Sequence, residues 1–111
     1  MNYTSKEQSK RLIELGLSPE TADMYYEDDI SIVVGHSWHE RHIPCWSVGA
    51  LLEVMPKLGV YPTFDLDREK PSIFYLNDGT YQDEVVFGST LLETTFNMVV
   101  WLLENNYIKK I

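Results

Sequence analysis

Every histidine of the chain, and its only cysteine, falls within one short row formed by His36, His39, His42 and Cys45. Imidazole nitrogen and thiolate sulfur are the ligands that zinc takes in proteins, usually four of them in a tetrahedral site. These four residues are therefore the candidate metal ligands, with zinc as the candidate cofactor. They are also the only cluster here that could supply a base and a nucleophile, so a metal- or thiol-dependent enzyme is one functional hypothesis.

The spacing of the row argues against a shared ion. Zinc motifs combine two close ligand pairs separated by a long insert, and this row does not. In an extended segment His39 would face away from its two neighbours, because side chains alternate along a strand. His36 and His42 would then lie roughly 20 Å apart, at about 3.3 Å per residue. Cys45 precedes a predicted helix, which could lower its pKa, but a small buried cysteine is the more ordinary interpretation.

The row must be positioned by neighbouring helices and strands. Thr4 and Glu7 have the pattern of a capping box, which predicts a first helix that ends near Gly16. Ser18 and Pro19 predict a second, short helix that runs to the apolar residues 24–26. Ser47 predicts the start of a third, in which apolar residues recur with helical spacing. Ser89 or Thr90 caps the longest helix, which ends at Asn105-Asn106.

Two hairpins complete the predicted elements. Ile30–Val34 is rich in β-branched residues and predicts a strand, with Trp38–Ile43 as its return partner and Pro44 as its stop. Ser72–Asn77 and Tyr81–Phe87 predict a second hairpin, joined by turn residues at 77–79. The sequence thus predicts a single small α+β domain over residues 1–111. We expect an antiparallel sheet of two hairpins with the helices packed on one face.

One aromatic residue breaks the pattern of the last helix. Trp101 points away from the apolar face that contains Leu92 and Leu103. Two interpretations stay open, namely a second buried surface and an exposed anchor for a partner or a dimer. The candidate partner-binding residues are Trp101, Met98, Tyr25 and Tyr26.

Composition and charge exclude some classes of function. Nine basic residues against 17 acidic ones give a net charge of −8, without a basic cluster. Binding to nucleic acid or to an acidic membrane draws on positive charge, so we expect neither. The apolar stretches are too short to span a membrane, there is no apolar leader, and one cysteine fits a reducing cytoplasm. The expected location is cytoplasmic.

Three segments resemble a known family: Thr21–Tyr25, Pro44–Leu52 and Trp101–Ile108. In this order they are similar to small uncharacterised proteins of Bacteroides-type gut bacteria and of their prophages and mobile elements. The resemblance implies no catalytic residues. The absence of catalytic motifs, the off-pattern Trp101 and this setting together favour a non-enzymatic protein-binding or accessory module of phage or mobile-element origin that has a protein partner. A homodimer is a further expectation, because the edges of the short sheet need covering. The metal- or thiol-dependent enzyme is the alternative hypothesis.

Overall fold

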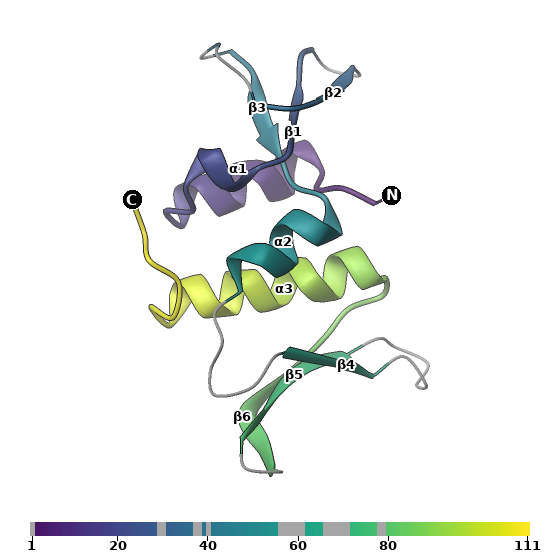
Figure 1. Ribbon diagram of the computed structural model, residues 1–111, viewed down its shortest axis with the longest axis vertical. Coiled ribbons are helices and arrows are strands. Elements are labelled where there is room, and N and C mark those ends of the chain that lie inside the picture. Colours follow the sequence, from purple (N-terminus) through teal and green to yellow (C-terminus); the bar gives the residue numbers. More distant parts are fainter. Residues whose placement is uncertain are drawn as a thin grey trace.

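Helices fill the middle of the molecule, and a small antiparallel sheet lies at each end of its long axis (Figure 1). This computed structural model describes residues 2–28, 31–36, 39, 41–55, 62–65, 72–77 and 80–111. Within 62–65, 74–77 and 80–87 the description covers the backbone alone. The molecule measures 44 × 31 × 19 Å. Among the described helices, none has the length and apolar content needed to span a bilayer.

Helix α1 (Lys6–Glu14) begins with a capping box one residue later than the sequence predicts. The Ser5 hydroxyl accepts from the Gln8 amide at 3.1 Å, and the Gln8 side chain accepts from the Ser5 amide at 2.8 Å. The predicted box of Thr4 and Glu7 is wrong because the Thr4 hydroxyl accepts from another segment, the backbone of Trp46. Each helix start needs such a partner, since its first amides have none within the helix.

The first sheet has the order β2-β1-β3 and is antiparallel throughout. Its strands are β1 (Met24–Tyr26), β2 (Ile32–Val34) and β3 (Ile43–Cys45). The short helix after Ser18 is a 3-10 turn, η1 (Pro19–Thr21). The prediction that it continues into residues 24–26 is wrong, because these residues pair with strands on both sides. The predicted return strand is also wrong, because β3 pairs with β1 and not with β2. Pro44 does not stop this strand but lies within it, since β3 is an edge strand where a missing amide is tolerated.

Four long-range hydrogen bonds tie the N-terminal segment to β1 and to the end of β3. The amide of Thr4 donates to the Trp46 carbonyl at 2.9 Å, and the Trp46 amide donates to the Thr4 hydroxyl at 3.0 Å. The Thr4 carbonyl accepts from the Tyr26 hydroxyl at 2.8 Å and from the Cys45 thiol at 3.3 Å. All four residues are buried, so this network fixes the N-terminal segment against β1 and β3.

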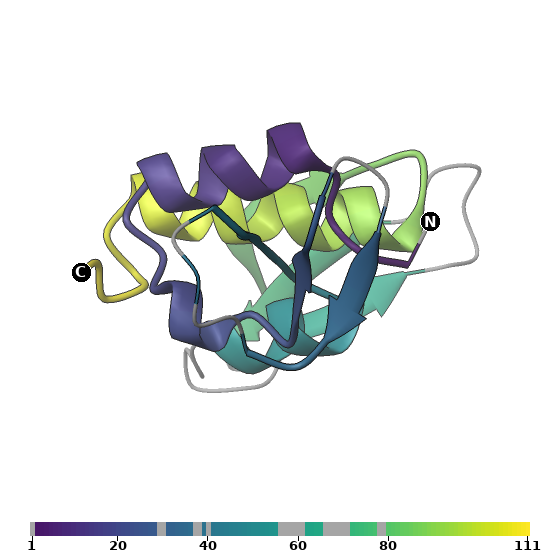
Figure 2. The same ribbon diagram turned by 90° about the horizontal axis from the view of Figure 1, so that it is seen from above.

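Helices α2 (Val48–Val54) and α3 (Leu91–Glu104) pack against each other. Ser47 and Thr90 cap them as predicted, each accepting from a backbone amide at 3.1 Å. The axes of α1 and α3 run side by side in the same direction (Figure 2), and an Arg11–Glu104 ion pair of 3.7 Å joins them near their ends. The fully buried core comes from these helices and from residues beside them, and it includes Leu12, Leu17, Trp46, Leu51, Met98, Val99, Leu102 and Leu103.

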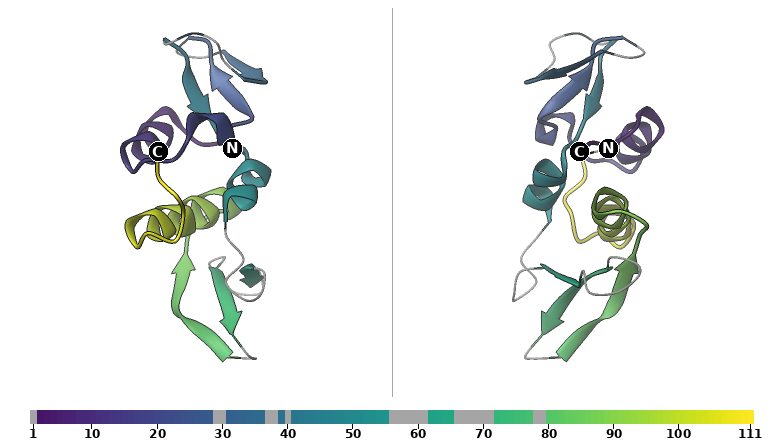
Figure 3. Two further views of the ribbon diagram at one scale, coloured as in Figure 1. Left: turned by 60° about the vertical axis from the view of Figure 1, so that its left-hand side comes forward. Right: turned by 90° about the vertical axis from the view of Figure 1, so that its right-hand side faces the viewer.

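The second sheet has the order β4-β5-β6 and packs on α3 through β5 and β6. Its strands are β4 (Pro62–Asp65), β5 (Ser72–Asn77) and β6 (Thr80–Phe87). The predicted hairpin of β5 and β6 is confirmed, and its turn at residues 78–79 lies outside the described residues. Figure 3 shows α3 between this sheet and the other helices. The α+β class is confirmed, while the strands are distributed over two sheets with the helices between them.

Candidate functional site

All three histidines line one groove between α1, η1 and the first sheet. The groove has a volume of about 1120 Å³, slightly above the roughly 300–1,000 Å³ of typical ligand-binding clefts, and it is open to solvent. Its histidines come from two places, because His36 follows β2 while His39 and His42 precede β3. The other lining residues of the described chain are Lys10, Ile13, Glu14, Pro19, Glu20, Ala22, Met24, Tyr25, Gly35, Ile43 and Pro44.

A row of three aromatic rings forms one part of this groove. The rings of Tyr25 and His42 are stacked, with centroids 4.7 Å apart and planes inclined by 14°. The ring of His39 lies next to that of His42, at 5.3 Å and 39°. The turn that carries both histidines is closed by a bond from the His42 amide to the His39 carbonyl at 3.1 Å. The sequence row thus becomes a fixed ring row, Tyr25–His42–His39, rather than a set of separate side chains.

The hydrogen bond that the His39 ring accepts does not favour the predicted zinc site. Its Nδ1 atom accepts a hydrogen bond from the Arg41 amide at 3.1 Å, so in the neutral ring the proton is on Nε2. Metal binding through Nε2 would require the other tautomer and the loss of this bond. Among the described residues, no group of three or more His, Cys, Asp and Glu side chains converges as metal ligands would.

Cys45 lies apart from the three histidines, on the buried side of β3. Its side chain is completely buried, donates to the Thr4 carbonyl and accepts from the Thr4 hydroxyl at 3.8 Å. Burial raises the pKa of the Cys45 thiol, which opposes formation of the nucleophilic thiolate. The structure therefore brings the histidines together and separates the cysteine from them.

The predicted partner-binding residues do not form one surface. Met98 has no exposed area and Tyr26 is buried with its hydroxyl bonded to Thr4, so both leave the candidate surface. Tyr25 remains in the groove. Trp101 is half-buried, packs against the core and stacks on Tyr107 with ring centroids 5.4 Å apart. The structure is thus closer to the interpretation of Trp101 as part of a second buried surface than to that of an isolated exposed anchor.

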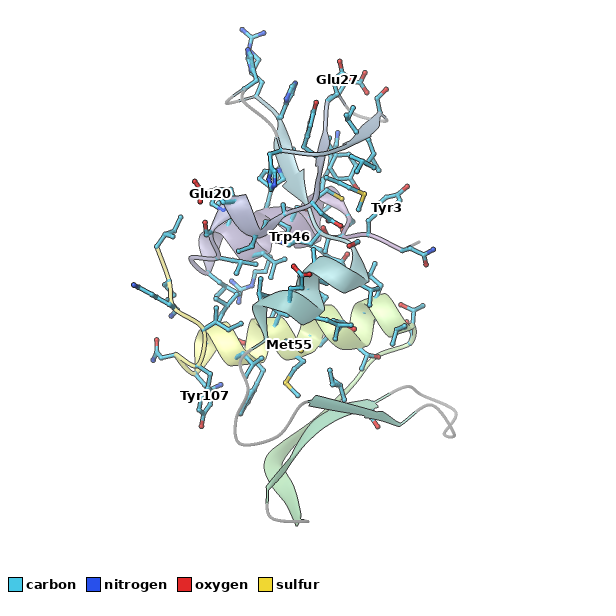
Figure 4. The ribbon with its side chains drawn as sticks, viewed as in Figure 1. Tyr3, Glu20, Glu27, Trp46, Met55 and Tyr107 are labelled. Carbon is cyan, nitrogen blue, oxygen red and sulfur yellow. The ribbon has the colours of Figure 1, made fainter. Side chains whose placement is uncertain are left out.

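The groove contains residues that the sequence did not single out. Ile13 is 37% exposed although it belongs to a helix whose other apolar residue, Leu12, is buried. The sequence signal for Ile13 was an apolar residue that lies next to, but outside, the buried face of the helix. Glu14 and Glu20 are exposed and line the same groove from α1 and η1. Figure 4 shows Glu20 at the side of the molecule, near the end of α1.

A second hollow of about 760 Å³ lies at the start of α2. Asp23 lines it, but both oxygens of its carboxylate accept from Ser47, one from the amide at 3.0 Å and one from the hydroxyl. Ser47 in turn caps α2. These polar groups already serve the helix start, so this hollow is a weaker candidate than the groove with the ring row.

Comparison with known proteins gives no further guide to the site. No family model matches the chain, and neither the curated proteins nor the solved structures contain a match.

Proposed function

We propose that this chain is a non-enzymatic protein-binding module, and that the groove between α1, η1 and the first sheet is its binding surface. The observation that carries the proposal is the lining of this groove. Two apolar residues, Ile13 of α1 and Pro44 of β3, line it together with the ring row Tyr25–His42–His39, and Pro44 is the strand partner of Tyr25. Concave apolar surfaces with a few polar groups are typical of binding sites.

The groove is preorganised for binding. The ring row is fixed by stacking, by the turn bond from His42 to His39, and by the bond from Arg41 to His39. Rings that are already ordered lose little conformational entropy when a partner binds. Aromatic residues in such positions often supply most of the affinity of an interface. The rigid aromatic row and the exposed Ile13 of α1 line the same groove, and together they are suited to hold an apolar side chain of a partner.

The metal- or thiol-dependent enzyme is less well supported. Its nucleophile would be Cys45, whose thiol is buried, hydrogen-bonded to Thr4 and raised in pKa. Its metal would need His39 in a tautomer that the Arg41 amide disfavours. An accessory role in phage or mobile elements remains part of the proposal on the strength of the family resemblance, and a homodimer is one form that the binding could take.

The proposal is tested by affinity capture from host extract with three immobilised baits: the wild-type chain, Ile13→Asp and Val34→Asp. Val34 is 82% exposed and lies outside the groove, so Val34→Asp is a control with the same change of charge. Circular dichroism first establishes that all three are folded. We expect a protein that the wild type and Val34→Asp retain and Ile13→Asp loses. Equal recovery by all three baits would show that the groove is not the binding surface.

A further inference from the structure

Two carboxylates line the groove without a counter-charge of their own. Glu14 is the last residue of α1, and Glu20 lies in η1. Both side chains are exposed, and neither has an ion-pair partner in the part of the chain that the structure describes. Lys10 is the one Lys or Arg among the lining residues described, so with neutral histidines the groove has a negative balance.

The position of Glu14 adds a second reason to expect a cation there. The C-terminal end of a helix has partial negative charge, so an acidic side chain at this end is unfavourable. The basic residue in the last turn of α1, Arg11, pairs with Glu104 of α3 instead. A positive group near Glu14 would therefore be favoured by the carboxylate and by the helix end together.

Resting on the proposed function, we infer that the groove binds a short cationic and apolar segment of a partner protein. An aliphatic side chain of this segment lies between Ile13 and the ring row, and its Arg or Lys side chains pair with Glu14 and Glu20. Arg suits both parts of the site, because its guanidinium stacks on aromatic rings and also pairs with carboxylates. The net charge of −8 attracts such a segment from a distance.

The same charge argument disfavours a second copy as the occupant. Two copies with this net charge repel each other, and association would have to bring one acidic chain to the acidic groove of another. A homodimer through the groove is accordingly an alternative outcome of the test. Sedimentation of the chain alone at the concentration used for binding would reveal it, and self-association that Ile13→Asp abolishes would overturn the inference.

The probes are two fluorescein-labelled ten-residue peptides that alternate Leu with Arg or Leu with Glu, measured by fluorescence anisotropy at low and high salt. We expect the Arg peptide to bind and the Glu peptide not to bind. The variant Glu14→Gln/Glu20→Gln should weaken binding of the Arg peptide about 3- to 10-fold, as expected for two exposed ion pairs. The control Glu27→Gln/Glu53→Gln changes the net charge equally at two exposed residues outside the groove and should have little effect.

The other outcomes separate this inference from the proposed function. If both peptides bind equally and Ile13→Asp abolishes both, the groove is a binding surface and its preference for cations is wrong. If the two double variants weaken the Arg peptide equally, the attraction is general and the inference is overturned. If neither peptide binds while affinity capture still depends on Ile13, only the inference fails. If capture fails as well, both are wrong.

Discussion

The imidazole ring of His42 lies almost parallel to the phenol ring of Tyr25, with their centroids 4.7 Å apart. Stacked aromatic pairs contribute roughly 0.5–1.5 kcal/mol beyond the area that they bury. We expect His42→Ala to lower the free energy of unfolding by about this amount, since the Tyr25 ring would lose its stacking partner. His42→Phe should retain most of the stability. Urea denaturation of both variants checks this, and equal stability of His42→Ala and wild type would contradict the stacking.

The buried network around Thr4 predicts a large effect of one hydroxyl. Thr4→Val keeps the shape of the side chain but leaves the Trp46 amide and the Ser9 hydroxyl without their partner. Each buried polar group left unpaired costs about 1–3 kcal/mol. Thr95→Val is the matched control, because the Thr95 hydroxyl is also buried but only donates to the Leu91 carbonyl, at 2.7 Å, within α3. Its removal leaves no donor without an acceptor, so chemical denaturation should show a clearly smaller loss for Thr95→Val.

Two glycines predict opposite results of the same substitution. A Cβ atom at Gly88 would lie 2.4 Å from the backbone nitrogen of Thr94, in the first turns of α3. Gly88→Ala therefore requires the backbone to move, and we expect a loss of at least about 1–3 kcal/mol. At Gly49 in α2, the nearest atom to such a Cβ is the Ser47 hydroxyl at 3.7 Å. Gly49→Ala should stabilise by up to about 1 kcal/mol, because alanine favours the helix. Thermal unfolding of both variants compares them directly.

Tyr26 predicts how stability depends on alkaline pH. Burial first, and then the nearby Cys45, raise the pKa of Tyr26 to about 12. A group whose pKa is higher in the folded state contributes stability that is complete below its unfolded pKa, 10.0, and is lost as the pH rises through 12. The urea concentration at the midpoint of unfolding should therefore decrease as the pH rises from 10 to 12. Burial also raises the pKa of Cys45, so its ionisation lowers the stability at alkaline pH in the same direction.

The control for this titration is Tyr26→Phe. It removes the hydroxyl that donates to the Thr4 carbonyl, so we expect a loss of about 1 kcal/mol at neutral pH. Above pH 10 the difference from wild type should shrink, because the variant has no phenol to ionise at this position. A constant difference from pH 8 to 12 would mean that Tyr26 titrates as it does in the unfolded chain.

Local signals were sufficient for the elements that are stable in their own sequence context. Ser47 followed by helical apolar spacing predicted α2, and alternating residues around a turn predicted β5 and β6. The strand β1 was missed because Met24–Tyr26 is short and follows a 3-10 turn, so its strand character comes only from pairing with β2 and β3. Such pairing joins residues far apart in sequence, which no local pattern specifies.

The candidate site shows the same division between local and tertiary information. The row of histidines was visible in the sequence, and the expectation of an extended segment separated the rings. The turn from His39 to His42 and the neighbouring Tyr25 bring two of them together instead. Glu14, Glu20 and Ile13 join the site only because α1 and η1 pack beside the sheet. The family resemblance and the protein-binding function stay predictions.

Trp101 and Tyr107 allow a test of whether this aromatic pair belongs to the core or to an interface. Trp101 packs against the core, while Tyr107 is 49% exposed, and their rings lie 5.4 Å apart. We expect Trp101→Ala to cost about 2–3 kcal/mol, somewhat less than a fully buried Trp, and Tyr107→Ala to cost less than about 1.5 kcal/mol. A double-mutant cycle by urea denaturation should give a coupling of about 0.5–1.5 kcal/mol. Neither residue lines the groove, so Tyr107→Ala should leave binding of the Arg peptide unchanged. Loss of that binding in a folded Tyr107→Ala variant would instead place the partner surface at α3.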